Sequence, residues 1–126
     1  MSKRAMIIDE LRPPGGAYNH LAEANGFVFT AGLSGHDPAT GKLPEGIQAQ
    51  TDQVISNLET ALGAVGLTLS DVVKTTVHLA DLADFGAFNE AYRERFPEPF
   101  PVRTTVGSQL AGILVEIDAV AARPAS

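Results

Sequence analysis

PVRTTVGSQLAGILVEIDAV, residues 101–120, contains two β-like segments separated by a turn-like stretch. The segments are residues 101–106 and 114–120, and the stretch between them begins at Gly107 and ends at Gly112. If the segments pair as an antiparallel hairpin about this turn, Arg103 and Glu116 become cross-strand neighbours on one face. The sequence therefore predicts a guanidinium beside a carboxylate.

Such a pair has a definite chemistry. A guanidinium binds a planar carboxylate through two parallel hydrogen bonds, and a nearby carboxylate can orient or deprotonate a water. Together they would suit the hydrolysis of a small acid that carries a reactive C=N bond. On the pattern alone, a structural cross-strand ion pair is the simpler interpretation.

The size and composition of the chain limit the possible classes of protein. The 126 residues predict a single domain, residues 1–126, with one core and no separate cofactor domain. The chain has no cysteine, which excludes disulfides, thiol nucleophiles and Cys-ligated zinc. The net charge is −6 with only nine Lys and Arg, and this argues against nucleic acid as a partner.

The apolar segments are short. None approaches the roughly 20 residues that would span a bilayer, so no membrane partner is expected. The first ten residues include Lys3 and Arg4 but no apolar run of signal-peptide length. We therefore expect a cytoplasmic protein.

Local patterns predict the order of the elements. Asn25-Gly26 favours a tight hairpin turn between a strand-like piece at 21–24 and a returning strand at 27–32. Helical spacing of apolar residues runs from about 45 to 65, and again from 84 to 96, where Pro97 prevents continuation. Strands are also expected at 5–8 and 71–79.

The resulting order is β-β-β-α-β-α-β-β, an α+β chain. Two helices can cover only one face of such a sheet, so the other face is either exposed to water or covered by another subunit. The apolar run Phe27-Val28-Phe29 places bulky residues on both faces. This favours an oligomer.

Several motifs follow one another along nearly the whole chain. They are Gly-Ala-Tyr at 16–18, residues 27–32, Asp-Pro-Ala-Thr-Gly at 37–41, Gln50, Gln53 and Asn57, residues 71–77 and 81–85, Asn89, Tyr92 and Phe96, and residues 101–106 and 115–118. In these motifs the chain resembles the Rid family, the reactive intermediate deaminases also called the YjgF family.

The resemblance implies a fold, an assembly and an activity. Members have a chorismate-mutase-like fold, with two helices on one face of a mixed sheet, and form homotrimers with clefts between neighbouring subunits. Deaminating members hydrolyse 2-imino or 2-enamino acids to 2-oxo acids and ammonia, without a metal or an organic cofactor. The expected partner of this chain is therefore a small 2-imino acid.

The resemblance also implies roles for residues. It assigns Arg103 to the substrate carboxylate and Glu116 to the water, as the catalytic pair. The cleft would be lined by the side chains or backbone of Tyr18, Thr30, Ala31, Gly32, Phe88, Asn89 and Thr105.

The chain departs from the family pattern at several of these positions. Ala17-Tyr18-Asn19-His20-Leu21 stands where members usually have Pro-Tyr-Ser-Gln-Ala, and Ala31-Gly32-Leu33 stands for Ser-Gly-Gln. Thr105 stands where cysteine is common. These changes motivate an alternative, a non-catalytic or regulatory trimer that binds small carboxylates. Ribonuclease activity, claimed for some relatives, is disfavoured by the acidic balance.

The remaining polar residues suggest no other site. His20, His36 and His78 are too scattered along the chain for metal-ligand spacing. Gly15-Gly16 lacks the pattern of a phosphate-binding loop.

Overall fold

The computed structural model describes residues 3–125. Seven strands, two α-helices and two short 3-10 helices follow one another along the chain. They are β1 (Arg4–Met6), β2 (Leu21–Ala24), β3 (Phe27–Thr30), β4 (Leu33–Ser34), α1 (Ile47–Gly63), η1 (Leu69–Asp71), β5 (Val72–Leu79), η2 (Leu82–Asp84), α2 (Phe85–Arg95), β6 (Val102–Gly107) and β7 (Val115–Ala122).

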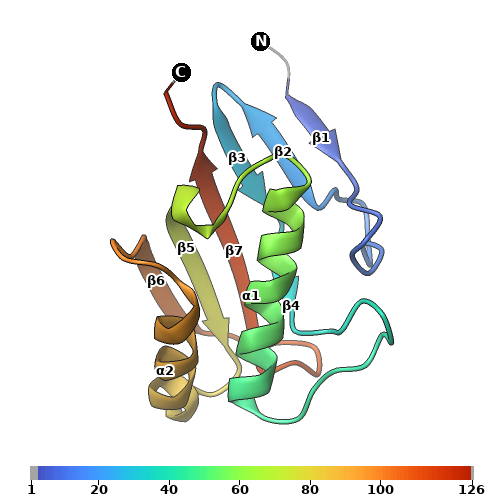
Figure 1. Ribbon diagram of the computed structural model, residues 1–126. Helices are drawn as coiled ribbons and strands as arrows, with labels where there is room; N and C mark the ends of the chain where they lie inside the picture. The colour runs from blue at the N-terminus through green and yellow to red at the C-terminus, as the bar shows by residue number, and fades with distance from the viewer. Residues whose placement is uncertain (1–2, 126) are drawn as a thin grey trace.

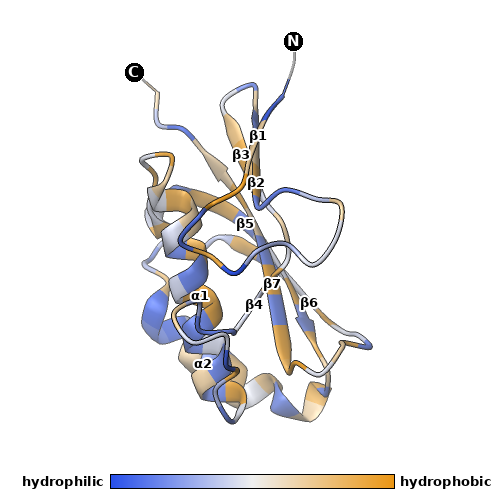
Figure 2. Ribbon diagram, turned by 90° about the vertical axis from the view of Figure 1, so that its right-hand side faces the viewer, coloured by the Kyte–Doolittle hydropathy of each residue, from blue (hydrophilic) through white to orange (hydrophobic). Residues whose placement is uncertain are grey.

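The strands form one mixed sheet in the order β1-β2-β3-β7-β5-β6, and β4 also pairs with β7. The β5–β6 pair is parallel and the other pairs are antiparallel. Both α-helices lie against the same face of the sheet (Figures 1 and 2). The expected fold class is therefore confirmed, with β4 as an additional short strand that the sequence patterns did not predict.

Local signals predicted several elements correctly. Asn25 and Gly26 both have positive φ, 52° and 79°, as a two-residue hairpin turn requires, and they join β2 to β3. Helix α1 ends at Gly63, and Gly66 follows with φ 78° in the left-handed region that glycine tolerates. Helix α2 ends at Arg95, one residue before Phe96 and two before the expected stop at Pro97.

The predicted hairpin between residues 101–106 and 114–120 is wrong. Strands β6 and β7 are not neighbours, because β5 lies between them. The connection between β6 and β7 passes around the end of β5: Ser108 N–H donates to the Leu79 carbonyl at 2.9 Å, and Ala80 N–H donates to the Leu114 carbonyl at 3.0 Å. The turn-like stretch therefore carries the chain past a third strand.

The core lies between the sheet and the helices. Every second residue of β7, from Val115 to Ala121, is buried and faces the helices, as are Val77 and Leu79 of β5. Helix α1 contributes Val54, Ile55, Leu58 and Leu62, and α2 contributes Phe88 and Tyr92.

The opposite face of the sheet has no helix against it (Figure 2). Phe27 and Phe29 of β3 are 45% and 44% exposed there, and Val102 and Val106 of β6 are 66% and 38% exposed. We call this surface the open face.

In residues 3–125, no helix is long and apolar enough to cross a membrane.

Candidate functional site

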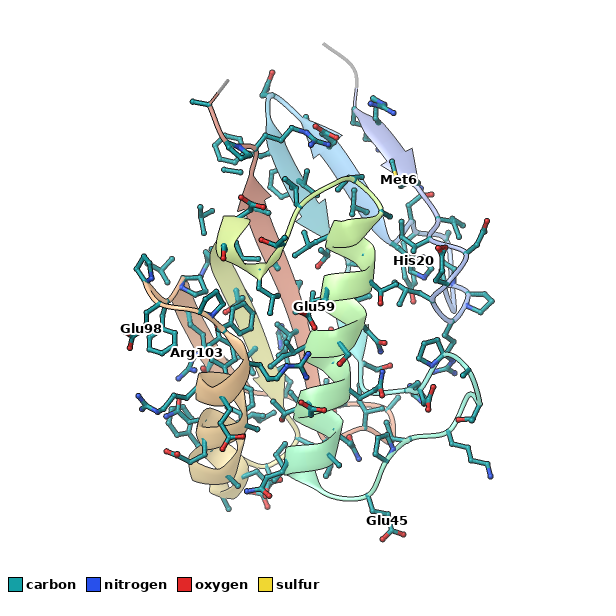
Figure 3. All side chains as sticks on the ribbon, viewed as in Figure 1. Met6, His20, Glu45, Glu59, Glu98 and Arg103 are labelled. Carbon is teal, nitrogen blue, oxygen red and sulfur yellow. The ribbon has the colours of Figure 1, made fainter. Side chains whose placement is uncertain are left out.

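Arg103 lies over a cluster of aromatic rings on α2. Its guanidinium carbon is 4.7 Å from the ring centroid of Tyr92, 5.3 Å from that of Phe88 and 5.6 Å from that of Phe85. The negative faces of aromatic rings attract a cation at such distances. Arg103 is therefore held in place by α2, on the helix side of the sheet (Figure 3).

The Tyr92 ring is itself fixed from the side of the sheet. Its hydroxyl is hydrogen-bonded to the hydroxyl of Thr75 on β5 at 2.8 Å, and both residues are buried. Burial raises the pKa of Tyr92, although the bond to Thr75 and the nearby Arg103 act in the opposite direction. The neutral phenol thus provides a rigid surface beneath the guanidinium.

A cavity of about 340 Å³ opens beside the guanidinium. Its lining is Asn89, Tyr92, Arg93, Phe100, Pro101 and Arg103, which we call the Arg103 half-site. No carboxylate within residues 3–125 forms a salt bridge with Arg103. The cavity therefore combines a positioned cation with room for an anionic ligand.

The residues that were predicted to line the cleft on this side lie in different positions. Asn89 lines the cavity. Phe88 does not line its surface, because its side chain is fully buried and supports Arg103 from behind. Thr105 pairs in register with Val77, so its side chain shares the helix-side face with Arg103. Sequence patterns missed Phe100 and Pro101, although the prolines that flank Phe100 signal a rigid segment.

A second group of predicted residues meets elsewhere. Tyr18, Ala31, Gly32 and Glu116 line a cavity of about 310 Å³, which we call the Glu116 half-site. A Cβ atom at Gly32 would overlap Oε1 of Glu116 and lie 2.7 Å from its Cδ. Only glycine at position 32 therefore allows Glu116 its observed position.

Thr30 is adjacent to this group, but its hydroxyl is already occupied. It donates to the Ala31 carbonyl at 2.8 Å and accepts from Ala119 N–H at 3.0 Å. The side chain thus ties the end of β3 to β7 and sets the path of the backbone into Ala31 and Gly32.

The predicted proximity of Arg103 and Glu116 is wrong within one chain. Arg103 pairs with Thr75 of β5, whereas Glu116 pairs with His78 of β5. Register partners point to the same face, and positions 75 and 78 of a strand point to opposite faces. Glu116 therefore lies on the open face and Arg103 on the helix side, because the strand between them separates the two.

Among residues 3–125, no group of three or more His, Asp or Glu side chains is arranged to hold a metal ion. Asp118 is the acidic neighbour of Glu116 on β7, and burial raises its pKa against the lowering effects of His78 and Lys74.

Comparisons with known proteins identify the family. The family model described as Endoribonuclease L-PSP matches residues 9–123. Reactive Intermediate Deaminase A of Arabidopsis thaliana is 41% identical over 123 residues, which are 94% of this chain and 66% of that protein. The 2-iminobutanoate/2-iminopropanoate deaminase of Rattus norvegicus is 38% identical over 109 residues, which are 84% of this chain and 80% of that protein.

Solved structures agree. The crystal structure of RidA from the Antarctic bacterium Psychrobacter sp. has a TM-score of 0.89 and 33% identity, and the match covers 94% of this chain and 98% of that one. The chain belongs to the Rid family of reactive intermediate deaminases, also called the YjgF family.

Proposed function

We propose that this protein hydrolyses small 2-imino acids, and their 2-enamino tautomers, to 2-oxo acids and ammonia. The observation that carries the proposal is Arg103, which three aromatic rings hold beside a cavity with no carboxylate partner in residues 3–125. Bidentate binding of a substrate carboxylate is the chemistry for which such a guanidinium is suited. The two relatives, which are named as deaminases, support the same reaction.

The proposed site is shared by two chains. Since β5 separates Arg103 from Glu116, the Arg103 half-site of one chain would face the Glu116 half-site of its neighbour. The exposed apolar side chains of the open face, Phe27, Phe29, Val102 and Val106, support burial against further copies. We propose a homotrimer, in which a closed ring repeats this contact three times.

The reaction needs little from the protein. Arg103 would hold the carboxylate of the imine, and Glu116 of the neighbouring chain would orient a water toward the C=N carbon. The water adds to that carbon and its proton moves to nitrogen, giving a carbinolamine. The C–N bond then breaks, and ammonia and the 2-oxo acid leave. Because such imines also hydrolyse in water, positioning and charge complementarity need supply only a few kcal/mol.

The test is the decay of imines generated in the assay. An amino-acid oxidase would release 2-iminopropanoate or 2-iminobutanoate, and the decay would be followed with wild type, Arg103→Ala and Arg103→Lys. We expect wild type to accelerate decay, Arg103→Ala to lose the acceleration, and Arg103→Lys to retain only part of it because lysine lacks the two-pronged geometry.

Equal decay with wild type and with Arg103→Ala would contradict the proposal. A rise in melting temperature with 2-oxo acids, without turnover of any imine, would instead support the alternative of a non-catalytic carboxylate-binding trimer.

A further inference from the structure

A smaller cavity of about 140 Å³ adjoins the Glu116 half-site and shares Tyr18 and Gly32 with it. Three polar side chains meet in this cavity. Arg12 donates from Nη1 to Nδ1 of His36 at 2.8 Å, and Ser34 Oγ lies 2.6 Å from the same nitrogen. We call this cavity the Arg12 pocket.

The Arg12 pocket lies directly beside the proposed water-orienting acid. Ser34 of β4 is the register partner of Glu116 on β7. Register partners share a face, and their Cβ atoms lie about 5 Å apart. A substrate bound near Glu116 therefore lies only a few ångströms from this pocket.

The backbone on both sides of the pocket is fixed by buried polar residues. His20, only 3% exposed, accepts from Ile8 N–H at 2.9 Å and is hydrogen-bonded through Nε2 to the Arg12 carbonyl at 2.8 Å. Asn57, 7% exposed, donates to the carbonyls of Ser34 at 3.0 Å and His36 at 2.9 Å. The backbone at Arg12, Ser34 and His36 is thus held in place before any ligand binds.

The charged group of the pocket is the Arg12 guanidinium. Its lining contains no Asp or Glu, and within residues 3–125 no carboxylate forms a salt bridge with Arg12. Burial and the nearby Arg12 lower the pKa of His36, so the ring is neutral, and since Nδ1 accepts, its proton is on Nε2. The Tyr18 hydroxyl accepts from Gly15 N–H at 3.1 Å, which leaves its own hydrogen to donate.

We infer that the Arg12 pocket binds a second acid group, so that the preferred substrates are 2-imino dicarboxylates with a short chain between the two carboxylates. This inference rests on the proposed function. The C1 carboxylate would bind Arg103 of one chain, and the distal carboxylate would bind Arg12 of its neighbour. The pocket takes no part in bond making: the imine and one water still give one 2-oxo dicarboxylate and one ammonia.

The inference is tested by comparing two imines. An aspartate oxidase would release 2-iminosuccinate, and an alanine-oxidising enzyme would release 2-iminopropanoate, each with wild type, Arg12→Gln and Lys42→Gln. Lys42 is an exposed lysine outside the lining of the pocket, so its variant is the matched control for loss of one positive charge. Arg12→Gln should lower kcat/KM for 2-iminosuccinate by about tenfold or more, because it removes a charged hydrogen bond to the distal carboxylate of the substrate.

The same variant should leave kcat/KM for 2-iminopropanoate within about twofold of wild type, since that substrate has no group to reach Arg12. Lys42→Gln should change neither. An equal loss on both imines, or an unchanged ratio between them, would overturn the inference.

A binding measurement separates this inference from the proposed function. If wild type accelerates no imine, the proposed function fails, and calorimetry with 2-oxoglutarate and with 2-oxobutanoate decides the pocket. Tighter binding of 2-oxoglutarate to wild type, lost in Arg12→Gln, would support the second acid site without catalysis. Equal affinity of wild type for the two 2-oxo acids would overturn it.

Discussion

Arg103 and Glu116 lie on opposite faces of one sheet. Arg103 pairs in register with Thr75 and Glu116 with His78, and the odd spacing of these two positions on β5 turns the side chains apart. One chain therefore presents a cation on the helix side of the sheet and an acid on the open face. The separation of the two residues can be tested by mixing chains that each lack one of them.

Mixing two inactive variants should restore activity. Arg103→Ala retains Glu116, and Glu116→Ala retains Arg103, so a random mixture of refolded chains contains some intact pairs of half-sites. For a cyclic assembly mixed at equal amounts, about one quarter of the sites carry both native residues. The rate of 2-iminopropanoate decay should recover to about that fraction of wild type. No recovery after subunit exchange, confirmed by tagged subunits, would contradict a shared site.

Gly32→Ala should lower activity without unfolding the protein. The new methyl group would overlap the Glu116 carboxylate, which can move away because it is the end of a flexible side chain. A displacement of about 1 Å can cost about a hundredfold in rate, so we expect kcat/KM to fall by about 10- to 100-fold. The control is Gly63→Ala, since a Cβ atom there meets nothing within 4 Å. Unchanged kinetics in Gly32→Ala would argue that the position of Glu116 is unimportant.

Tyr92→Phe should destabilise the fold. The change removes the hydroxyl that is bonded to Thr75, leaving a buried hydroxyl without a partner at a cost of about 1–3 kcal/mol. The exposed tyrosine Tyr18 provides the control, and Tyr18→Phe should change the free energy of unfolding by less than about 0.5 kcal/mol. Urea unfolding at one protein concentration measures both. The double variant Thr75→Val/Tyr92→Phe should be less destabilised than the sum of the single changes.

Phe29→Lys should dissociate the proposed trimer. Phe29 is 44% exposed on the open face, and burial of a lysine charge in an apolar contact between chains is costly. Sedimentation should show a shift from trimer to monomer. Leu82→Lys is the control, because Leu82 is 56% exposed but lies in η2, which precedes α2. Equal masses for wild type and Phe29→Lys would argue that this face is not an interface.

His36 should make the fold less stable in mild acid. Burial, and to a smaller extent the charge of Arg12, lowers the pKa of His36 below its usual value of 6.5. The unfolded chain therefore takes up the proton at a higher pH than the folded chain. The contribution of neutral His36 is therefore complete above about pH 7.5 and is lost progressively as the pH falls below 6.5. The melting temperature of wild type relative to His36→Gln should fall between about pH 7.5 and pH 5. A relative rise would contradict this assignment.

Elements with local causes could be predicted from the sequence. Asn25-Gly26 favours a two-residue turn in any context, and the helical spacing from Ile47 to Leu62 buries one stripe of α1 against any apolar sheet. Arg103 and Glu116 could be selected from their residue types and from the resemblance to the Rid family, although the hairpin expected to pair them does not form. The position of β5 between them could not, since β5 and β6 are both rich in Val and Thr, and either could be the neighbour of β7.

The sequence by itself determined both helices and every strand except β4, the choice of Arg103 and Glu116 as candidate residues, and the family that the chain resembles. Only the tertiary structure decided that Arg103 and Glu116 face away from each other, and that Arg12, Ser34 and His36 meet beside Glu116. Local patterns act over a few residues, whereas strand order depends on which distant segments together bury the most apolar surface. The position of β5 between β6 and β7 leaves no mark on the local sequence pattern, yet it decides which side chains can meet.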